Sequence, residues 1–344
     1  MELLGWLREL MARPSPTGRE GEVQRFLVEA LRGMGFDVIS EPVLPGRPNL
    51  YAVRGRPGYL LATHVDTVPA WGHPVEGFAV EDGTAYGRGV ADPKGQIAAL
   101  LTALEETEAP AFVALFVDEE KGGKGSEAFR DPWGMDLKGA VVLEPTELRI
   151  CNLQFGSVEF EAEVKGEEMH GATYDGDKNA ILRCSKLIQD LCELPFLRGS
   201  GITVGRIEGG RDPQVIPDSC KFTADIPVPP GVKVEEALDE VLATLDRYGA
   251  EYTLLSVDEP TETSPDSQVA QDLLRAATET LKRPVSFGVM SAWTDAANLS
   301  KKGMPTVVFG AGSLALCHTK RENIRLRELS ALSEILIRFL EGRY

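Results

Sequence analysis

Histidine and acidic residues stand directly after apolar segments of this 344-residue chain. His64 and Asp66 follow the apolar run LLAT, and because they are two residues apart, a strand would project their side chains from one face. Asp92 lies in the turn-rich string GRGVADPKG, directly before a predicted helix. A carboxylate at such a strand-to-helix turn can meet a cation, so this stretch is the centre of the predicted site.

Three later segments end in the same kinds of residue. They supply Glu119 and Glu120 after the run AFVALFV, Glu144 after GAVVL, and His318 in the loop after PTVVFG. The carboxyl ends of parallel strands meet at one edge of a sheet, and ligands bind there. Acids gathered at one edge repel one another unless a cation is present, so the pattern predicts a metal site.

Imidazole and carboxylate ligands together suit Zn²⁺, with Co²⁺ or Mn²⁺ as substitutes. Two histidines and three acids are more than one zinc ion needs, but they fit two ions. Each ion would have its own histidine and carboxylate, and one more carboxylate would bridge both. Such two-metal sites turn a water into hydroxide near neutral pH. The predicted metal ligands are His64, Asp92, Glu120, Glu144 and His318.

The two other acids have different predicted roles. Glu119 is the candidate general base, because it adjoins a ligand in sequence and its strand end lets it face the water. Asp66 is predicted to hydrogen-bond the far nitrogen of His64 and so to fix the tautomer of the imidazole.

Apolar strands that alternate with helices must position these residues. This alternation predicts an α/β domain with a mostly parallel sheet flanked by helices on both faces. Helices are expected over residues 18–35 and 94–106. Thr17 and Glu20 stand in the S/T-x-x-E relation of a capping box at the start of the first of these helices. Lys94 is expected to start the second helix with a solvated charge.

The middle of the chain has a different character. From about Cys151, several segments alternate apolar and polar residues, as half-exposed strands do. The predicted elements follow the order β-α-β-β-α-β, which is the pattern of a ferredoxin-like α+β domain. We therefore expect residues 152–256 to form a second domain, inserted into a first domain made of residues 1–151 and 257–344.

Composition limits the partners and the compartment. The apolar share of 43% is enough for a packed core, and the length suggests about two domains. The net charge of −17 argues against nucleic acid as a partner, because phosphate binding needs clustered basic residues. Five scattered cysteines without a CxxC pair fit a reducing compartment. The first residues lack signal-peptide features and the longest apolar run is too short to span a bilayer, so we expect a cytoplasmic protein with no membrane partner.

Five strings carry a resemblance to a known family: in order, THVDT, GRGVADPKG, VDEEKGG, LEPTE and CHTKRENI. They resemble the motifs of the M20 metallopeptidases, a family of dizinc aminoacylases, and the resemblance covers essentially the whole chain. It implies that Asp92 bridges the two ions. It also implies that one ion is held by His64 and Glu144, and the other by Glu120 and His318. The peptide bond after the bridging aspartate would be cis.

The same resemblance implies further roles. Residues 152–256 would be a lid and dimerisation domain, the rest of the chain a catalytic dizinc domain, and the protein a homodimer. EMHGATYDGDKNAI resembles the lid motif of the family, which makes His170 a donor to the oxyanion of the scissile carbonyl group. Glu119 would act first as the base and then as the acid that protonates the leaving amine.

The implied activity is hydrolysis of the amide bond of an N-acyl amino acid, with release of the free amino acid. Trp71, in the loop WGHPVEGF, resembles an element of deacylase-type members and favours an acetylornithine deacetylase or desuccinylase type. An arginine reads the substrate carboxylate in many relatives, but this chain has Pro227 at that position. Other cations would have to replace it, or the substrate differs. The candidates are Arg206, Arg211 and Lys221.

Two alternatives stay open within the hydrolase class. One is release of lysine or ornithine from an amino-group carrier protein, and the other is dipeptidase or carboxypeptidase activity. A metal-stabilised scaffold without catalysis belongs to a different class. Such a protein would be expected to lose Glu119 or a ligand, whereas this chain keeps all of them.

Overall fold

The chain divides into two units in the computed structural model, which describes residues 1–71, 77–173 and 176–343. Each unit has its own hydrophobic core, as independent domains do. Unit 1 contains Met1–Asn152, Thr263–Met290 and Thr294–Tyr344. Unit 2 contains Leu153–Glu262 and Ser291–Trp293.

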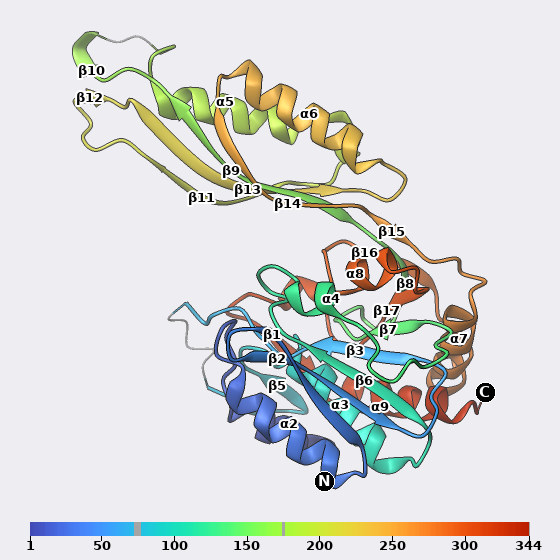
Figure 1. Ribbon diagram of the computed structural model, residues 1–344. Helices are drawn as coiled ribbons and strands as arrows, with labels where there is room; N and C mark the ends of the chain where they lie inside the picture. The colour runs from blue at the N-terminus through green and yellow to red at the C-terminus, as the bar shows by residue number, and fades with distance from the viewer. Residues whose placement is uncertain (72–76, 174–175, 344) are drawn as a thin grey trace. The chain divides into compact units, whose positions relative to one another are not determined.

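A nine-stranded sheet, labelled in Figure 1, provides the framework of unit 1, although β15 and the end of β8 fall within the bounds of unit 2. Its strands, in order across the sheet, are β1 (Asp37–Leu44), β2 (Arg47–Arg54), β6 (Ala111–Phe116), β3 (Leu60–His64), β7 (Ala140–Val142), β17 (Thr306–Val308), β8 (Ile150–Gln154) and β15 (Thr261–Glu262), with β16 (Phe287–Met290) also paired to β8. The central strands β6, β3, β7 and β17 are parallel. They are buried along their whole length because both of their faces are covered.

The edges of this sheet run antiparallel. β1 pairs antiparallel with β2, β2 with β6, and β8 with β17. β1 ends at Leu44 and β2 begins at Arg47, so only a tight turn joins them, and such a turn cannot return a parallel strand. The predicted α/β class is therefore confirmed, and the parallel pairing is concentrated at the centre of the sheet.

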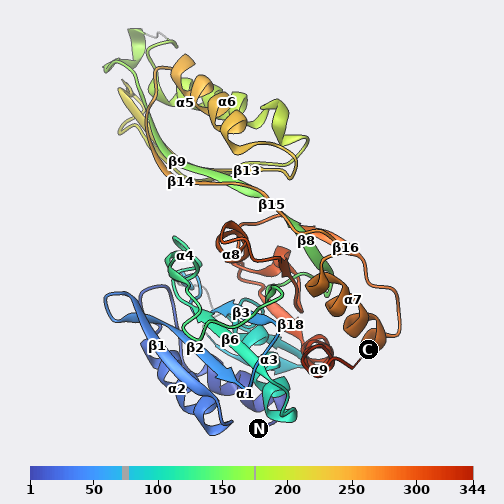
Figure 2. The ribbon, with the colours of Figure 1, turned by 45° about the vertical axis from the view of Figure 1, so that its right-hand side comes forward.

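Helices cover both faces of the sheet (Figures 1 and 2). They are α1 (Leu3–Met11), α2 (Gly21–Gly33), α3 (Lys94–Glu106), α4 (Lys124–Ala128), α7 (Gln268–Leu281), α8 (Ala296–Lys301) and α9 (Leu326–Glu341). α3 packs against α1 and α9, and α4 packs against α8. A small sheet of β4 (Ala79–Glu81), β5 (Thr84–Tyr86) and β18 (Asn323–Arg325) completes the unit. In the described ranges, no helix has both the length and the apolar character that crossing a membrane requires.

The predicted capping box at the start of α2 is wrong. The helix begins at Gly21, and the side chain of its N-cap residue, Glu20, makes no capping hydrogen bond. The Glu20 carboxylate binds Arg47 instead, and the Thr17 hydroxyl donates to Asp66. The side chains of Thr17 and Glu20 both bind residues outside the helix, so they do not cap its first amides.

The predicted solvated charge on Lys94 is also wrong. Lys94 is the first residue of α3, as expected, but only 2% of its surface is exposed. Its Nζ donates to the carbonyl oxygens of Leu10 (3.1 Å) and Arg13 (2.8 Å), at the end of α1. Burial lowers the pKa of Lys94 to about 8. The side chain is therefore a buried link between the two helices.

Unit 2 is built on a four-stranded antiparallel sheet with two helices on one face (Figure 2). Its elements in chain order are β9 (Gly156–Lys165), α5 (Ala180–Cys192), β11 (Thr203–Gly209), β13 (Ser219–Val228), α6 (Val234–Arg247) and β14 (Glu251–Asp258). The strand order β11-β13-β9-β14 puts the first and third strands at the centre, as in ferredoxin-like domains. Alternate residues of β9, such as Phe160 and Val164, are buried in the core of this unit. A two-stranded ribbon of β10 (Met169–His170) and β12 (Val215–Ile216) completes it.

Candidate metal centre

The predicted ligands of unit 1 stand at the carboxyl ends of neighbouring strands. His64 is the last residue of β3, Glu120 follows β6, and Glu144 follows β7. Because these strands are parallel neighbours, their ends lie at one edge of the sheet. Asp92 precedes α3, and the Asp92–Pro93 peptide bond is cis, as the resemblance implied.

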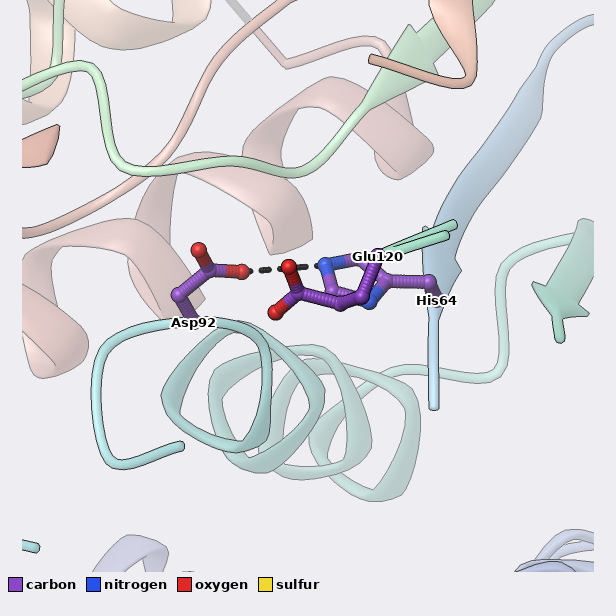
Figure 3. Close-up of side chains that lie close together, drawn as sticks. All are labelled: His64, Asp92 and Glu120. Carbon is purple, nitrogen blue, oxygen red and sulfur yellow. Dashed lines mark hydrogen bonds and ion pairs between the residues drawn. The ribbon is translucent and has the colours of Figure 1, made fainter. Parts of the chain in front are cut away.

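Three of these side chains form a compact cluster (Figure 3). His64, Asp92 and Glu120 each offer one ligand atom, and these atoms lie within 4.8 Å of one another. Figure 3 shows the three side chains converging from β3, from the loop before α3 and from the loop after β6. Nε2 of His64 lies 2.9 Å from Oδ1 of Asp92. One imidazole and two carboxylates are a donor set that suits zinc.

The two carboxylate oxygens of Asp92 serve two different groups. On one side, Nε2 of His64 contacts Oδ1 of Asp92 and lies 3.4 Å from Oε1 of Glu144. On the other side, Nε2 of His318 lies 3.4 Å from Oδ2 of Asp92 and 3.0 Å from Oε2 of Glu120. Two pairs of one histidine and one glutamate therefore flank a shared aspartate.

The charges of this cluster fit a divalent cation. Burial raises the pKa of Glu144 well above its usual value, and burial together with Asp92 raises the pKa of Glu120. Burial opposes the protonation of His318, but hydrogen bonds to Asp92 and Glu120 outweigh it and raise the histidine's pKa to about 10. Oε1 of Glu144 is buried and accepts no hydrogen bond within the part of the chain that the structure describes. A metal ion would satisfy that oxygen and offset the acids, so the residues present fit a metal.

Asp66 joins the imidazole of His64 to the loop after β6. It is fully buried, and its Oδ1 lies 3.5 Å from Nδ1 of His64. The backbone amides of Glu119 and Glu120 donate to its two oxygens, at 3.2 and 3.3 Å. The Thr17 hydroxyl donates to Oδ2 at 2.9 Å. Such a partner orients both the histidine and the two glutamates.

Glu119 lies among the same charges. Burial raises the pKa of its carboxyl group well above the usual value; His64 opposes this shift, and Glu144 and Glu120 add to it. A carboxyl group with a raised pKa can take up and release a proton near neutral pH. The loop after β6 thus brings together a candidate ligand and a candidate base.

Glu322 supports the loop of Asp92, and the sequence analysis missed it. Its Oε1 accepts hydrogen bonds from the backbone amides of Ala91 (3.2 Å) and Asp92 (3.4 Å). Its Oε2 accepts from Nη1 of Arg88 at 2.7 Å. Only 1% of its surface is exposed. The available signal was its place in the string CHTKRENI, four residues after His318.

We expect Glu322→Ala to lower the free energy of unfolding by about 3–5 kcal/mol, because it leaves the buried Arg88 guanidinium without its partner. Urea unfolding monitored by circular dichroism measures this change. The control is Glu279→Ala, which removes an exposed ion pair with Lys282 and should change the stability by less than about 1 kcal/mol. Equal, small effects of the two substitutions would contradict the assigned role of Glu322.

His170 lies in unit 2, whereas the other predicted site residues lie in unit 1. It is the exposed last residue of β10, and its Nδ1 accepts a hydrogen bond from the amide of Ala172 at 3.1 Å. Trp71 is 61% exposed, and the guanidinium carbon of Arg88 lies 5.6 Å from the centre of its ring. The rest of that loop, residues 72–76, lies outside the described residues.

The candidate carboxylate-binding cations of unit 2 all have acidic partners. Pro227 lies in β13, where its neighbour across the sheet is Ser157. Each of the three cations forms an ion pair: Arg206 with Glu208 (2.5 Å), Arg211 with Glu168 (3.6 Å) and Lys221 with Glu163 (3.4 Å). Arg211 and Lys221 also line one surface pocket of about 240 Å³. Exposed pairs of this kind are weak and can exchange partners.

Comparisons with known proteins agree on the family. The model of peptidase family M20/M25/M40 matches residues 60–342. An acetylornithine deacetylase of Myxococcus xanthus is 30% identical over 360 residues, which cover 95% of this chain and 89% of the relative. A succinyl-diaminopimelate desuccinylase of Acinetobacter baylyi is 26% identical over 375 residues, which cover 96% of both proteins.

Solved structures agree on the fold. A tripeptidase of Staphylococcus aureus superposes with a TM-score of 0.81 at 20% sequence identity, and the match covers 99% of this chain and 98% of that one. The family match, the two relatives and this fold confirm the resemblance drawn from the five strings. The chain belongs to peptidase family M20/M25/M40.

Proposed function

We propose that this protein is a metal-dependent amidohydrolase that cleaves an N-acyl amino acid into a carboxylate and a free amino acid. The observation that carries the proposal is Asp92, whose two oxygens face two separate pairs of one histidine and one glutamate. Two full-length relatives support the substrate class, because one is named as a deacetylase and the other as a desuccinylase of amino acids.

The proposed cofactor is a pair of Zn²⁺ ions, for which Co²⁺ or Mn²⁺ could substitute. His64 and Glu144 would hold one ion, His318 and Glu120 the other, and Asp92 both. When bound, the ions supply Lewis acidity, which polarises a carbonyl group and lowers the pKa of water. The buried acids support this assignment, and so does Oε1 of Glu144, which accepts no hydrogen bond from any described residue.

The protein's own residues would move the protons. Glu119 takes a proton from the attacking water and later gives it to the leaving amine, and its raised pKa suits both steps. Asp66 holds the imidazole of His64 in one tautomer while it fixes the backbone of the Glu119 loop. His170 donates a hydrogen bond to the carbonyl oxygen as negative charge develops on it.

The proposed assembly is a cytoplasmic homodimer. Residues 152–256 would act as lid and dimerisation domain, and residues 1–151 and 257–344 as the catalytic domain. The fold of unit 2 around its own core supports a separate role for that region. All five cysteines are free thiols, which supports a reducing compartment.

A second candidate substrate is a lysine or ornithine linked to an amino-group carrier protein. The observation that favours it is Pro227, which stands where many relatives have a carboxylate-reading arginine. Each of the cations that could replace that arginine lies beside a carboxylate, which would compete with a substrate carboxylate for it. In such a substrate the carrier protein is itself the acyl group on the amino acid's amine, so contacts with the carrier would take over part of the recognition that the arginine provides.

A panel of substrates tests the proposal. It contains N-acetyl-ornithine, N-succinyl-diaminopimelate, other N-acetyl amino acids, dipeptides and a carrier-linked lysine, each assayed for amine release with zinc restored and after chelation. The expected result is metal-dependent release of one class of amino acid. No amine release from any of them, with or without zinc, would contradict the proposed activity.

A further inference from the structure

The loop that carries Glu119 and Glu120 begins with an unusual backbone conformation. Asp118 has a φ of +70°, a region that residues other than glycine rarely adopt. Its carbonyl oxygen accepts hydrogen bonds from the amides of Gly122 (3.0 Å) and Gly123 (2.7 Å). The chain therefore turns back on Asp118, and the direction of the next residue, Glu119, depends on how Asp118 is held.

Arg47 binds the side chain of Asp118 at the start of the loop. It is the first residue of β2, and its Nη1 lies 2.8 Å from Oδ1 of Asp118. The other edge of its guanidinium group binds Glu20, with Nε 3.0 Å from both carboxylate oxygens and Nη2 2.5 Å from Oε1. Such a planar fork fixes two carboxylates relative to each other, which a lysine cannot do.

The three side chains of Glu20, Arg47 and Asp118 are more buried than those of a surface ion pair. The side chain of Glu20 is fully buried, and those of Asp118 and Arg47 are 8% and 16% exposed. Solvent therefore screens their interaction weakly. Removal of the guanidinium group would leave the buried carboxylates of Glu20 and Asp118 without this counter-charge at the start of the loop.

The segment around Glu20 is itself fixed to the site. The amide of Thr67 donates to the carbonyl oxygen of Ser15 at 2.9 Å. The amide of Thr17 in turn donates to the carbonyl oxygen of Thr67 at 3.1 Å. The Thr17 hydroxyl reaches Asp66, which binds the amides of the same loop. Glu20 thus provides a rigid base against which Arg47 can hold the loop.

We propose that Arg47, clamped between Glu20 and Asp118, is the positioning residue that sets the direction of Glu119. This inference rests on the proposed function of Glu119 as a base. Glu20 and Arg47 both precede residue 60, where the family match begins.

The test compares Arg47→Gln and Arg47→Lys with a matched control, Arg54→Gln. Arg54 is the last residue of the same strand, is similarly buried (13% exposed), and donates to the carbonyl oxygens of Leu104 and Ala109, away from the loop. Three quantities are measured: amide hydrogen exchange of residues 117–124, the bound metal, and kcat and KM on the responding substrate.

In Arg47→Gln, the amides of Gly122 and Gly123 should exchange faster than in the wild type. kcat should fall by about 10–100-fold, with KM and metal content little changed, because the loop keeps its residues but loses their alignment. Arg47→Lys keeps the positive charge but not the planar guanidinium group. Its loop exchange and its kcat should lie between those of the wild type and those of Arg47→Gln. Arg54→Gln should match the wild type in loop exchange and in kcat.

Unchanged exchange of the loop in Arg47→Gln would overturn the inference, and so would faster exchange with the wild-type kcat. If Arg47→Gln does not fold, Arg47→Lys provides the test. Wild-type loop exchange together with a wild-type kcat in Arg47→Lys would also overturn the inference. The exchange measurement needs no substrate. A wild-type protein that hydrolyses nothing would therefore contradict the proposed function separately from this inference.

Discussion

The Glu119→Gln variant is expected to lose about 10²–10⁴-fold in kcat while it keeps the metal content of the wild-type protein. Glutamine has nearly the same shape, but its amide cannot take a proton from water or return one to the leaving amine. The raised pKa of Glu119, caused by burial and by the nearby Glu144 and Glu120, is the property that this substitution removes.

Steady-state kinetics and elemental analysis of the same preparation measure both effects. The control is Glu127→Gln, in α4 a few residues later, where the carboxylate is exposed and paired with Lys124. This control should keep both the metal and the activity. If Glu119→Gln loses its metal, the residue is a ligand rather than a base, and if it keeps its activity, the base is another residue.

The Asp92→Ala variant is expected to lose metal from both halves of the site. In the wild-type protein the two carboxylate oxygens of Asp92 face His64 and His318 separately. The substitution by alanine therefore removes a partner that the two histidines share. We expect kcat to fall by more than about 10³-fold, since metal ions supply several kcal/mol of charge stabilisation and each 1.4 kcal/mol is tenfold in rate. Metal per chain after dialysis and kcat measure the effect.

Asp92→Asn gives a graded comparison, because it keeps one carbonyl oxygen but loses the charge and the second acceptor. It should bind metal more weakly than the wild type and more strongly than Asp92→Ala. The surface substitution Asp266→Ala is the control and should change neither quantity. Wild-type metal content in Asp92→Ala would show that Asp92 is not the shared ligand.

Much of the site could be anticipated because its residues stand at strand ends. Apolar runs such as those before His64 and Glu144 predict buried strands, and parallel strands place their carboxyl ends at one edge. The types of the residues and their positions at strand ends together predict which side chains lie close to one another. The meeting of His64, Glu120 and Glu144 follows from that edge, whereas the place of Asp92 between them, in the loop before α3, was implied by the family resemblance.

The contacts that support the site could not be predicted in the same way. Thr17 and Glu20 match the spacing of a capping box, but their partners, Asp66 and Arg47, lie 49 and 27 residues further along the chain. Lys94 looks like an exposed helix start until α1 is packed over it. Local spacing cannot reveal a partner that only the tertiary fold brings near.

Glu322 illustrates the same limit. It binds the backbone of Asp92 and the side chain of Arg88, more than 200 residues earlier in the chain. Apart from its place in the string CHTKRENI, nothing in its immediate neighbours distinguishes it from an exposed glutamate of a polar loop. Its burial depends on the loop after β17 and the loop before α3 lying side by side, which follows from the whole sheet.

We propose that Asp92 joins two metal ions in one hydrolytic site, and a zinc titration of the chelated protein tests this claim. Bound zinc per chain and amine release from the responding substrate are followed in the same samples. We predict binding of about two zinc ions per chain, with amine release reaching its maximum as the second ion binds. Full activity with one zinc ion or none per chain would contradict the claim.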